Sequence, residues 1–323
     1  MEKSVKQHKD LVDNVRKEVS KVLVGQEGPL NGCLRAIIAN GNVLVEGVPG
    51  IAKTLLIRAL SVACGCTFNR IQFTVDLLPT DITGITTYDR KKGFTVVKGP
   101  IFANFVIADE INRASPKTQS ALLEAMQEKQ VTIGKHTFPL QLPFFVMANN
   151  NPIESGGTYP LPEAQIDRFL FKVFMDYPAV EEEKEIMKRN ITLQKFEDFK
   201  LKPILNQSKI IRIQQAVKAI HLGEDIEKYI VKIVDATRNS EKYHLKMGKY
   251  IEYGCSPRGS IGLFIGSKAE SLMHGSHYVT PQHVKNVAHE VLRHRIILNY
   301  EAQAEGIRTD EVIDEILSRV PVP

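Results

Sequence analysis

The sequence predicts an α/β protein in which an open parallel sheet, covered by helices, is followed by an all-helical domain. A Gly-rich turn at residues 47–54 joins a short β-branched run to an apolar helical run. A second buried-type run, residues 105–110, ends in two acids. Strand-like runs then stop near Pro178, beyond which amphipathic segments follow. We therefore expect two domains, residues 1–177 and 178–323.

Length and composition fit a soluble chain. The 323 residues suggest about two domains, and 43% hydrophobic with 24% charged residues is ordinary for a globular protein. A net charge of +5 without a dense Lys/Arg tract does not indicate nucleic-acid binding. The four cysteines lack zinc-site spacing, which favours reduced thiols in the cytoplasm. No signal-like or long apolar run occurs, so we expect neither export nor membrane insertion.

The N-terminal part predicts two helices before the first strand. Apolar residues recur at helical spacing over residues 3–23 and 29–39, and Val24-Gly25-Gln26-Glu27 interrupts them. Residues 42–46 are apolar and β-branched, which is typical of a buried strand. Residues 68–73 predict a second strand.

The octapeptide Gly47-Val48-Pro49-Gly50-Ile51-Ala52-Lys53-Thr54 lies between the first strand and an apolar helix. This arrangement is typical of a phosphate-binding loop, whose backbone N–H groups and helix N-terminus face the phosphates. Lys53 would reach the β/γ-phosphates, and the Thr54 hydroxyl would hold Mg²⁺. The strict motif has Gly where this chain has Ala52, which fits if the backbone there suits an L-residue. The alternative is an ordinary Gly/Pro turn.

The acids Asp109 and Glu110 end the predicted strand 105–110. Ligands bind at the carboxyl ends of parallel strands, so this pair is expected beside the phosphate-binding loop. Asp109 could then hold Mg²⁺, usually through water, and Glu110 could polarise an attacking water molecule. The alternative is a solvated turn.

Two β-rich runs around a Gly-containing turn predict a hairpin at residues 80–98, the alternative being a surface loop. Ser115-Pro116 predicts the start of a helix, and residues 130–140 a second hairpin. Strand 144–148 runs into Asn149-Asn150-Asn151-Pro152, where an amide could contact the γ-phosphate or serve only turn chemistry. The last predicted strand is residues 171–175.

The second domain is predicted to consist of amphipathic helices. These are expected at residues 181–190, 209–221, 225–238, 258–273, 281–296 and 309–319.

With these residues in hand, the chain resembles a MoxR-type AAA+ ATPase. The resemblance extends in order over nearly the whole chain, in the strings Gly47–Thr54, Asp76–Gly84, Gly99–Ala103, Ala108–Ala114, Gly157–Phe169 and Ser256–Arg258. It implies an αβα P-loop core with a five-stranded parallel sheet in the order 5-1-4-3-2, an all-α lid and a ring hexamer. The hairpins near 80–98 and 130–140 match insertions of this clade, and Ala before the loop Lys is usual in the family.

The resemblance also implies ATP and Mg²⁺ as cofactors. It assigns nucleotide contacts to Val24, Gly25, Gln26, Gly47, Val48, Pro49, Gly50, Ile51, Ala52, Lys53, Thr54, Leu55, Asp109 and Arg258. Thr54 and Asp109 would hold Mg²⁺. Catalytic roles fall to Lys53, to Glu110 as base, to Asn151 as sensor 1 and to Arg168 as a finger for the neighbouring subunit, with Arg258 as sensor 2. Three consecutive Asn residues leave open which one acts.

The function that follows is Mg²⁺-dependent ATP hydrolysis that remodels a client complex, with a von Willebrand factor A-type partner. Two alternatives stay open: the motor of a metal-chelatase-type complex, and a nucleotide-gated adaptor with little turnover. A DNA helicase or transcription activator is less favoured. The insertion at 80–98 lacks the Gly-Ala-Phe-Thr-Gly-Ala loop of enhancer-binding activators.

Overall fold

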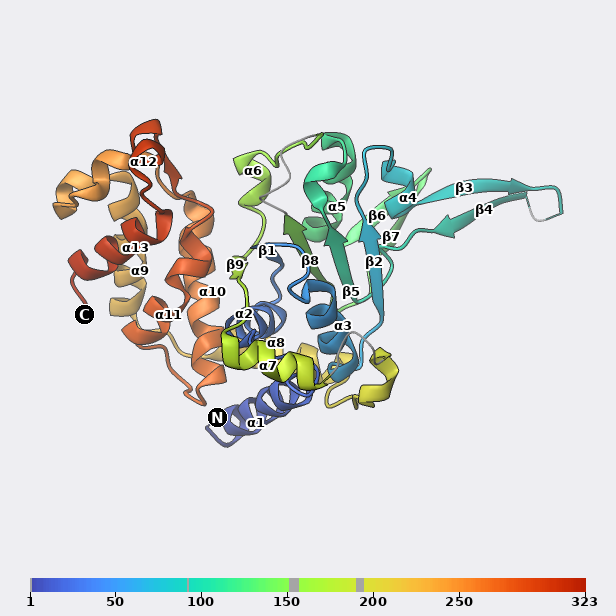
Figure 1. Cartoon of the computed structure of the whole chain (residues 1–323), viewed down its shortest axis with the longest axis horizontal. Helices are drawn as coiled ribbons and strands as arrows, with labels where there is room; N and C mark the ends of the chain where they lie inside the picture. The colour runs from blue at the N-terminus through green and yellow to red at the C-terminus, as the bar shows by residue number, and fades with distance from the viewer. Residues whose placement is uncertain (1, 92, 151–156, 190–194) are drawn as a thin grey trace.

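The computed structural model describes residues 2–91, 93–150, 157–189 and 195–323. Figure 1 shows the sheet and its helices in the centre, a group of helices on the left and a hairpin that projects to the right. No helix in these four ranges is long and apolar enough to cross a membrane.

The central sheet confirms the predicted strand order. It runs β2 (Phe68–Gln72), β5 (Phe105–Asp109), β8 (Phe145–Asn150), β1 (Val43–Gly47) and β9 (Phe171–Met175), and all neighbouring pairs are parallel. Numbered by their order in the core, these strands read 5-1-4-3-2 from the β9 edge. The register pairs Gln72 with Asp109 and Glu46 with Asn150, so polar residues at neighbouring strand ends lie side by side.

Strand β5 is buried throughout, and its alternating side chains separate two hydrophobic cores. Phe105 and Ile107 pack in the core that includes residues of α1 (Glu2–Val19), α2 (Glu27–Ile38) and α3 (Lys53–Ala63). Val106 and Ala108 face the other core, which includes residues of α5 (Pro116–Glu128). The sheet is therefore covered on both faces, as a parallel sheet requires.

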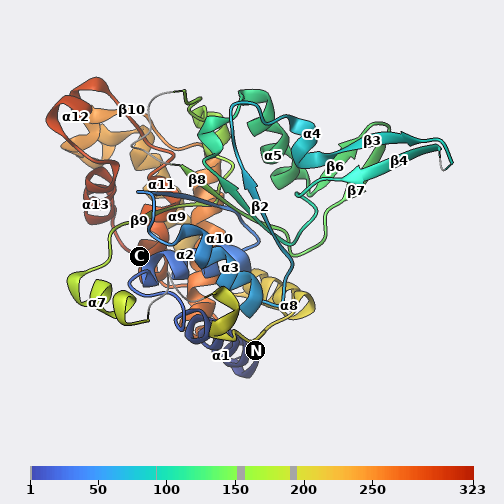
Figure 2. The ribbon, with the colours of Figure 1, turned by 45° about the vertical axis from the view of Figure 1, so that its right-hand side comes forward.

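Both predicted hairpins are present. The first consists of β3 (Gly84–Asp89) and β4 (Gly93–Lys98) and follows the short helix α4 (Pro79–Thr83). It extends away from the body of the molecule in two views (Figures 1 and 2). Tyr88 and Phe94 are 67% and 80% exposed, and their ring centroids lie 5.2 Å apart, edge to face. The second hairpin is β6 (Gln130–Ile133) with β7 (His136–Pro139).

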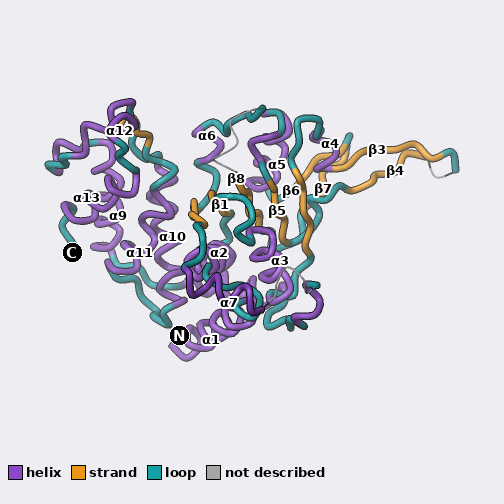
Figure 3. Tube along the Cα trace, viewed as in Figure 1, coloured by secondary structure: helices purple, strands orange, loops and turns teal. Residues whose placement is uncertain are grey.

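The second half of the chain is mainly helical, and each predicted helix is found there (Figure 3). Its helices are α7 (Val180–Arg189), α8 (Gln207–Ala219), α9 (Glu224–Arg238), α10 (Pro257–Met273), α11 (Pro281–Leu292), α12 (Tyr300–Glu305) and α13 (Thr309–Arg319). The expectation that strands stop near Pro178 is wrong, because β10 (Ile251–Tyr253) pairs antiparallel with β11 (Ile297–Leu298). These strands are too short for side-chain alternation to mark them in the sequence.

Short helical segments complete the chain. They are α6 (Glu163–Ile166) and the 3₁₀ turns Ile111–Arg113, Phe196–Phe199, Ser240–Tyr243 and Met247–Tyr250.

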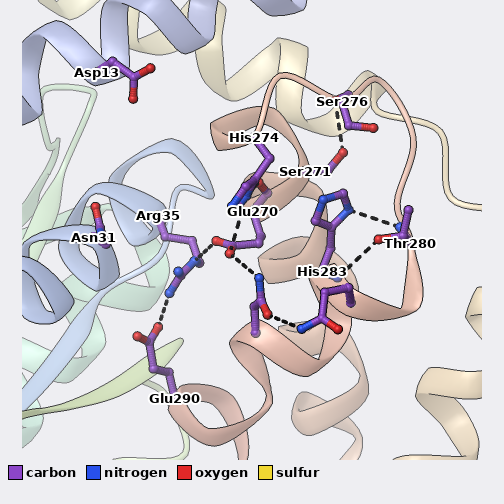
Figure 4. Close-up of polar contacts among 12 residues, drawn as sticks. Asp13, Asn31, Arg35, Glu270, Ser271, His274, Ser276, Thr280, His283 and Glu290 are labelled. Atoms are coloured by element: carbon purple, nitrogen blue, oxygen red, sulfur yellow. Dashed lines mark hydrogen bonds and ion pairs between the residues drawn. The ribbon is translucent and has the colours of Figure 1, made fainter.

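A buried ion cluster joins α2 to the helices α10 and α11 (Figure 4). Arg35 of α2 donates to Glu270 of α10 at 2.8 Å and forms a second ion pair with Glu290 of α11. Asn286 donates to the other oxygen of Glu270 at 3.0 Å. Burial, partly offset by Arg35, raises the pKa of Glu290. One guanidinium thus holds two carboxylates from two helices of the second half.

All four cysteines are free thiols. Cys33, Cys64 and Cys255 are buried, and Cys66 is half-buried. Burial raises the pKa of Cys66 to about 12 and that of Cys255 to about 11. Burial therefore keeps these two thiols protonated at neutral pH.

Candidate active site

A cleft of about 440 Å³ opens at the carboxyl ends of the central strands. We call it the phosphate cleft. Its lining residues are Pro49, Gly50, Ala52, Lys53, Thr54, Leu55, Arg70, Asp109, Glu110 and Asn149. The fold therefore brings the Gly-rich loop and the acidic pair together in one place, because β1 and β5 flank β8 in the sheet.

The loop backbone turns through two left-handed residues before α3 begins at Lys53. Gly50 has φ +82° and Ala52 has φ +68°. The backbone at Ala52 is therefore not one that L-residues usually adopt, contrary to the condition under which Ala was expected to fit. Such strain is common at ligand-binding sites.

Lys53 lies at the N-terminus of α3 with its ammonium turned back toward the loop. Its Nζ donates to the backbone carbonyl of Gly47. Burial lowers the pKa of Lys53, while the negative charges of Asp109, Glu110 and Glu46 act to raise it. A partly desolvated ammonium forms strong charge-assisted hydrogen bonds and is well suited to binding phosphate.

Asp109 is buried, and cationic and amide groups occupy its two oxygens. Arg70 of β2 donates to Oδ2 through Nε at 3.0 Å and also through Nη2. Asn149 of β8 donates to Oδ1. The parallel strand ends thus converge on this one carboxylate.

Glu110 adopts a left-handed conformation with φ +55°. Its backbone N–H donates to Asn149 Oδ1 at 2.7 Å, which stabilises the turn. Its carboxylate Oε2 accepts from Gln72 Nε2 at 2.9 Å and lies 3.0 Å from Arg113 Nε. Both contacts restrain the carboxylate oxygen Oε2.

Four residues at this site were not singled out from the sequence: Arg70, Gln72, Arg113 and Asn149, the last of which was only one of three candidate Asn residues. A signal for the first two existed, because Arg70 and Gln72 alternate on the predicted strand 68–73, and the observed strand β2 lies beside β5. Asn149 was one of three candidates for sensor 1. Asn151, the residue chosen, lies outside the residues that the structure describes.

A second cleft of about 470 Å³ adjoins the phosphate cleft, with which it shares Pro49, Gly50, Ala52 and Leu55. Apolar side chains dominate its lining, among them Val22, Leu23, Val24, Ile51, Tyr177, Pro178 and Ile186. Gln26 also lines it and donates through Nε2 to the carbonyl of Asp176 at 2.8 Å. An apolar cleft next to a phosphate-binding loop can accept a flat heterocycle such as adenine.

Arg168 and Arg258 lie together, and neither lines the phosphate cleft or the apolar cleft. They line a separate cavity of about 480 Å³, which we call the arginine cleft. Lys129 and Arg295 line it as well. Arg258 Nη1 is 3.6 Å from Asp167 Oδ2. The structure thus separates these two predicted site residues from the Gly-rich loop of their own chain.

The donors in the phosphate cleft fit Mg²⁺ bound to a nucleotide. The Thr54 hydroxyl and the Asp109 carboxylate are hard oxygen ligands. Within the described ranges, no group of three or more His, Cys, Asp or Glu side chains could hold a metal by itself. Mg²⁺ at phosphate sites needs only one or two protein ligands, since phosphate and water supply the rest.

Comparisons with known proteins agree with this geometry. Residues 42–171 match the model of the ATPase family associated with various cellular activities, and residues 247–316 match an AAA lid domain. The chain is 44% identical to Chaperone MoxR1 of Mycobacterium tuberculosis, over 95% of this chain and 81% of the relative. It is also 44% identical to the uncharacterized protein YeaC of Bacillus subtilis, over 97% and 95% of the two chains.

Protein MoxR of Paracoccus denitrificans is 30% identical over 94% of this chain and 93% of its own length. The crystal structure of a protein from Cytophaga hutchinsonii, assigned as an ATPase, has a chain that is 45% identical in sequence to this one. It superposes with a TM-score of 0.93 over 100% of this chain and 98% of that chain.

Proposed function

The chain belongs to the MoxR-type AAA+ ATPases, and we propose that it hydrolyses ATP with Mg²⁺ in a ring and uses the energy to remodel a partner complex. The observation that carries the proposal is the phosphate cleft. There Lys53 and Thr54, which follow β1, line the same cleft as Asp109 and Glu110 at the end of β5.

Each residue of the cleft has a defined task in this proposal. The N-terminal amides of α3 and the Lys53 ammonium bind the β- and γ-phosphates. Thr54 and Asp109 hold Mg²⁺, which, when bound, offsets the negative charge of the phosphates. Glu110 accepts a proton from the attacking water. Asn149 positions the acidic pair, since it contacts both Asp109 and the backbone of Glu110.

The arginine cleft supports a ring in which neighbouring subunits complete one another's sites. It concentrates Lys129, Arg168, Arg258 and Arg295 away from the subunit's own Gly-rich loop. Cationic side chains of this kind favour an anion, and the γ-phosphate bound by the next subunit is a suitable one. We assign Arg168 and Arg258 to that neighbouring site.

Mixing two inactive variants tests this assignment. Arg168→Ala should lower turnover by about 10³–10⁵-fold, as for other arginine fingers. Lys53→Ala should abolish phosphate binding in its own subunit only. Mixed rings should recover part of the activity, because a Lys53→Ala subunit still donates Arg168 to an intact neighbouring site. Steady-state phosphate release measures the recovery, and mixtures that stay inactive would contradict catalysis in trans.

The partner is proposed to be a protein with a von Willebrand factor A-type domain, together with a client complex. The name of the relative Chaperone MoxR1 supports remodelling of protein rather than of nucleic acid. The nucleotide-gated adaptor remains the second candidate, and slow phosphate release that the partner does not accelerate would favour it.

A further inference from the structure

Arg168 is exposed, and among the described residues none holds its guanidinium by a hydrogen bond or an ion pair. A side chain that must reach a neighbouring subunit can be free, but its backbone must be well placed. The backbone around Arg168 is indeed held firmly, and the groups that hold it come from the lid.

Arg295, which follows α11, makes most of these contacts. Its Nε donates to Asp167 Oδ1 at 2.8 Å. Its Nη2 donates to the carbonyls of Phe169 at 2.7 Å and Asp167 at 3.2 Å, and Nη1 donates to the carbonyl of Leu170 at 3.2 Å. One guanidinium thus binds the chain on both sides of Arg168. The Arg295 side chain itself is only 3% exposed.

The chemistry of this contact is specific to arginine. A guanidinium is planar and carries five N–H donors in a fixed fork, whereas an ammonium is a point donor on a flexible stem. Lysine at position 295 could pair with Asp167 but could not hold the three carbonyls at the same time. A buried, fully bonded guanidinium also leaves its partners little freedom to move.

The same carboxylate ties the segment to the N-terminus of α10. Asp167 Oδ2 accepts a hydrogen bond from Ser256 Oγ at 2.8 Å, and Ser256 caps the helix that carries Arg258. His294 adds a contact of 3.1 Å from Nε2 to the carbonyl of Phe169. Arg168, Arg258 and the lid are therefore connected through Asp167 and Arg295.

We propose that Arg295 is a positioning residue for Arg168: it fixes the backbone that carries the arginine finger to the lid. A change in the lid of one subunit would then move the finger that enters its neighbour's site. This inference rests on the proposed role of Arg168 in trans.

The first experiment compares Arg295→Met with Arg293→Met in the full-length protein. Arg293 is also largely buried, but it pairs with Asp310 and contacts the carbonyl of Lys172, outside the segment 167–170. We expect Arg295→Met to lower turnover by about 10–100-fold, because a displacement near 1 Å can cost that much. ATP affinity of the subunit should change by less than about 2-fold, and Arg293→Met should keep near-normal turnover. Equal losses in both variants would overturn the proposal.

Arg295→Lys guards against a variant that fails to fold. It keeps a cation for Asp167 but loses the forked N–H donors of the guanidinium. We therefore expect a folded protein whose turnover is lowered, but by less than in Arg295→Met. Turnover equal to that of the wild type would overturn the proposal.

A double variant and a mixed ring separate positioning from general damage. If Arg295 acts through Arg168, Arg168→Ala combined with Arg295→Met should be no slower than Arg168→Ala alone. Arg295→Met mixed with Lys53→Ala should recover activity, since the defect lies in the donated finger. Additive losses, or no recovery here, would overturn the role of Arg295. If Arg168→Ala mixed with Lys53→Ala also fails to recover, the trans finger itself is wrong.

Discussion

Glu110 combines an uncommon backbone conformation with a constrained side chain. Its φ of +55° is rare for a residue other than glycine, and strain of this kind costs about 1–3 kcal/mol. The hydrogen bond from its N–H to Asn149 helps to maintain it. The carboxylate oxygen Oε2 also contacts Gln72 and Arg113, which restrain the orientation of the side chain.

Replacing Glu110 by Gln should separate binding from catalysis. The variant keeps the shape and the hydrogen-bonding reach of the side chain but loses the base, so ATP affinity should be retained. Turnover should fall by about 10²–10⁴-fold, the usual contribution of general base catalysis. Calorimetric ATP binding and phosphate release measure the two effects. Glu124→Gln, an exposed change on α5, serves as the control, and near-normal hydrolysis by Glu110→Gln would refute the assignment.

The buried ammonium of Lys129 should make the free energy of unfolding depend on pH. Burial lowers its pKa from 10.5 to about 8, so at lower pH the fold contains a desolvated ammonium. From pH 8 to 10.5 the unfolded chain binds more protons than the folded one, and wild-type stability rises with pH. Lys129→Met should therefore be more stable than wild type by about 1–3 kcal/mol below pH 8. This advantage should fade toward pH 10.5. Denaturation of both proteins at several pH values measures this difference in stability. A difference that does not change with pH would contradict the lowered pKa of Lys129.

At the residue scale, the sequence predicted the loop, the acidic pair and their proximity, because motif spacing and strand ends are local properties. It did not predict the contacts of Arg70 and Gln72 with the two acids. Those contacts depend on the register between β2 and β5, which no short motif encodes.

Hairpin β3–β4 stands apart from both hydrophobic cores for most of its length. The contact of Tyr88 with Phe94 is local to the hairpin, and both rings are mostly in solvent. The stability of the rest of the fold should therefore depend little on its tip.

The change Phe94→Ala should lower the free energy of unfolding by less than about 1.5 kcal/mol, since mainly one aromatic pair is lost. The same change at the fully buried Phe73 should cost about 3–5 kcal/mol. Urea denaturation of the two variants gives the comparison. Similar losses at both positions would show that the hairpin tip packs against other parts of the protein.

At the scale of elements, long periodic segments and Gly-containing turns were predictable. Both hairpins and the helices of the second half other than α12, which was not predicted, follow from such patterns. The pair β10–β11 was missed because its strands have only three and two residues.

At the scale of the whole molecule, buried arginines hold the lid against the core. Arg35 reaches from α2 to Glu270 and Glu290, and Arg295 reaches from the lid to the chain around Arg168. The sequence predicted a lid but not its docking, because these pairs are separated by more than a hundred residues. Only the tertiary fold brings them together.

Removal of the Arg35 side chain alone should strongly destabilise the fold. Arg35→Met leaves two buried carboxylates without their cation and should destabilise the protein by about 3–5 kcal/mol. Replacing all three residues by apolar ones, as in Arg35→Met with Glu270→Leu and Glu290→Met, should recover much of that loss. Thermal unfolding compares the two. If the triple variant is less stable than Arg35→Met, the ion cluster stabilises the fold by more than the mutual neutralisation of its three charges.

The burial of the thiols has a practical consequence for fluorescent labelling of the protein. Alkylating dyes react with thiolates, and the high pKa values of Cys66 and Cys255 leave few of these at neutral pH. A maleimide fluorophore should therefore prefer exposed cysteines introduced on the hairpin and on the lid. Energy transfer between two such labels could follow lid movement during ATP turnover without first removing the native cysteines.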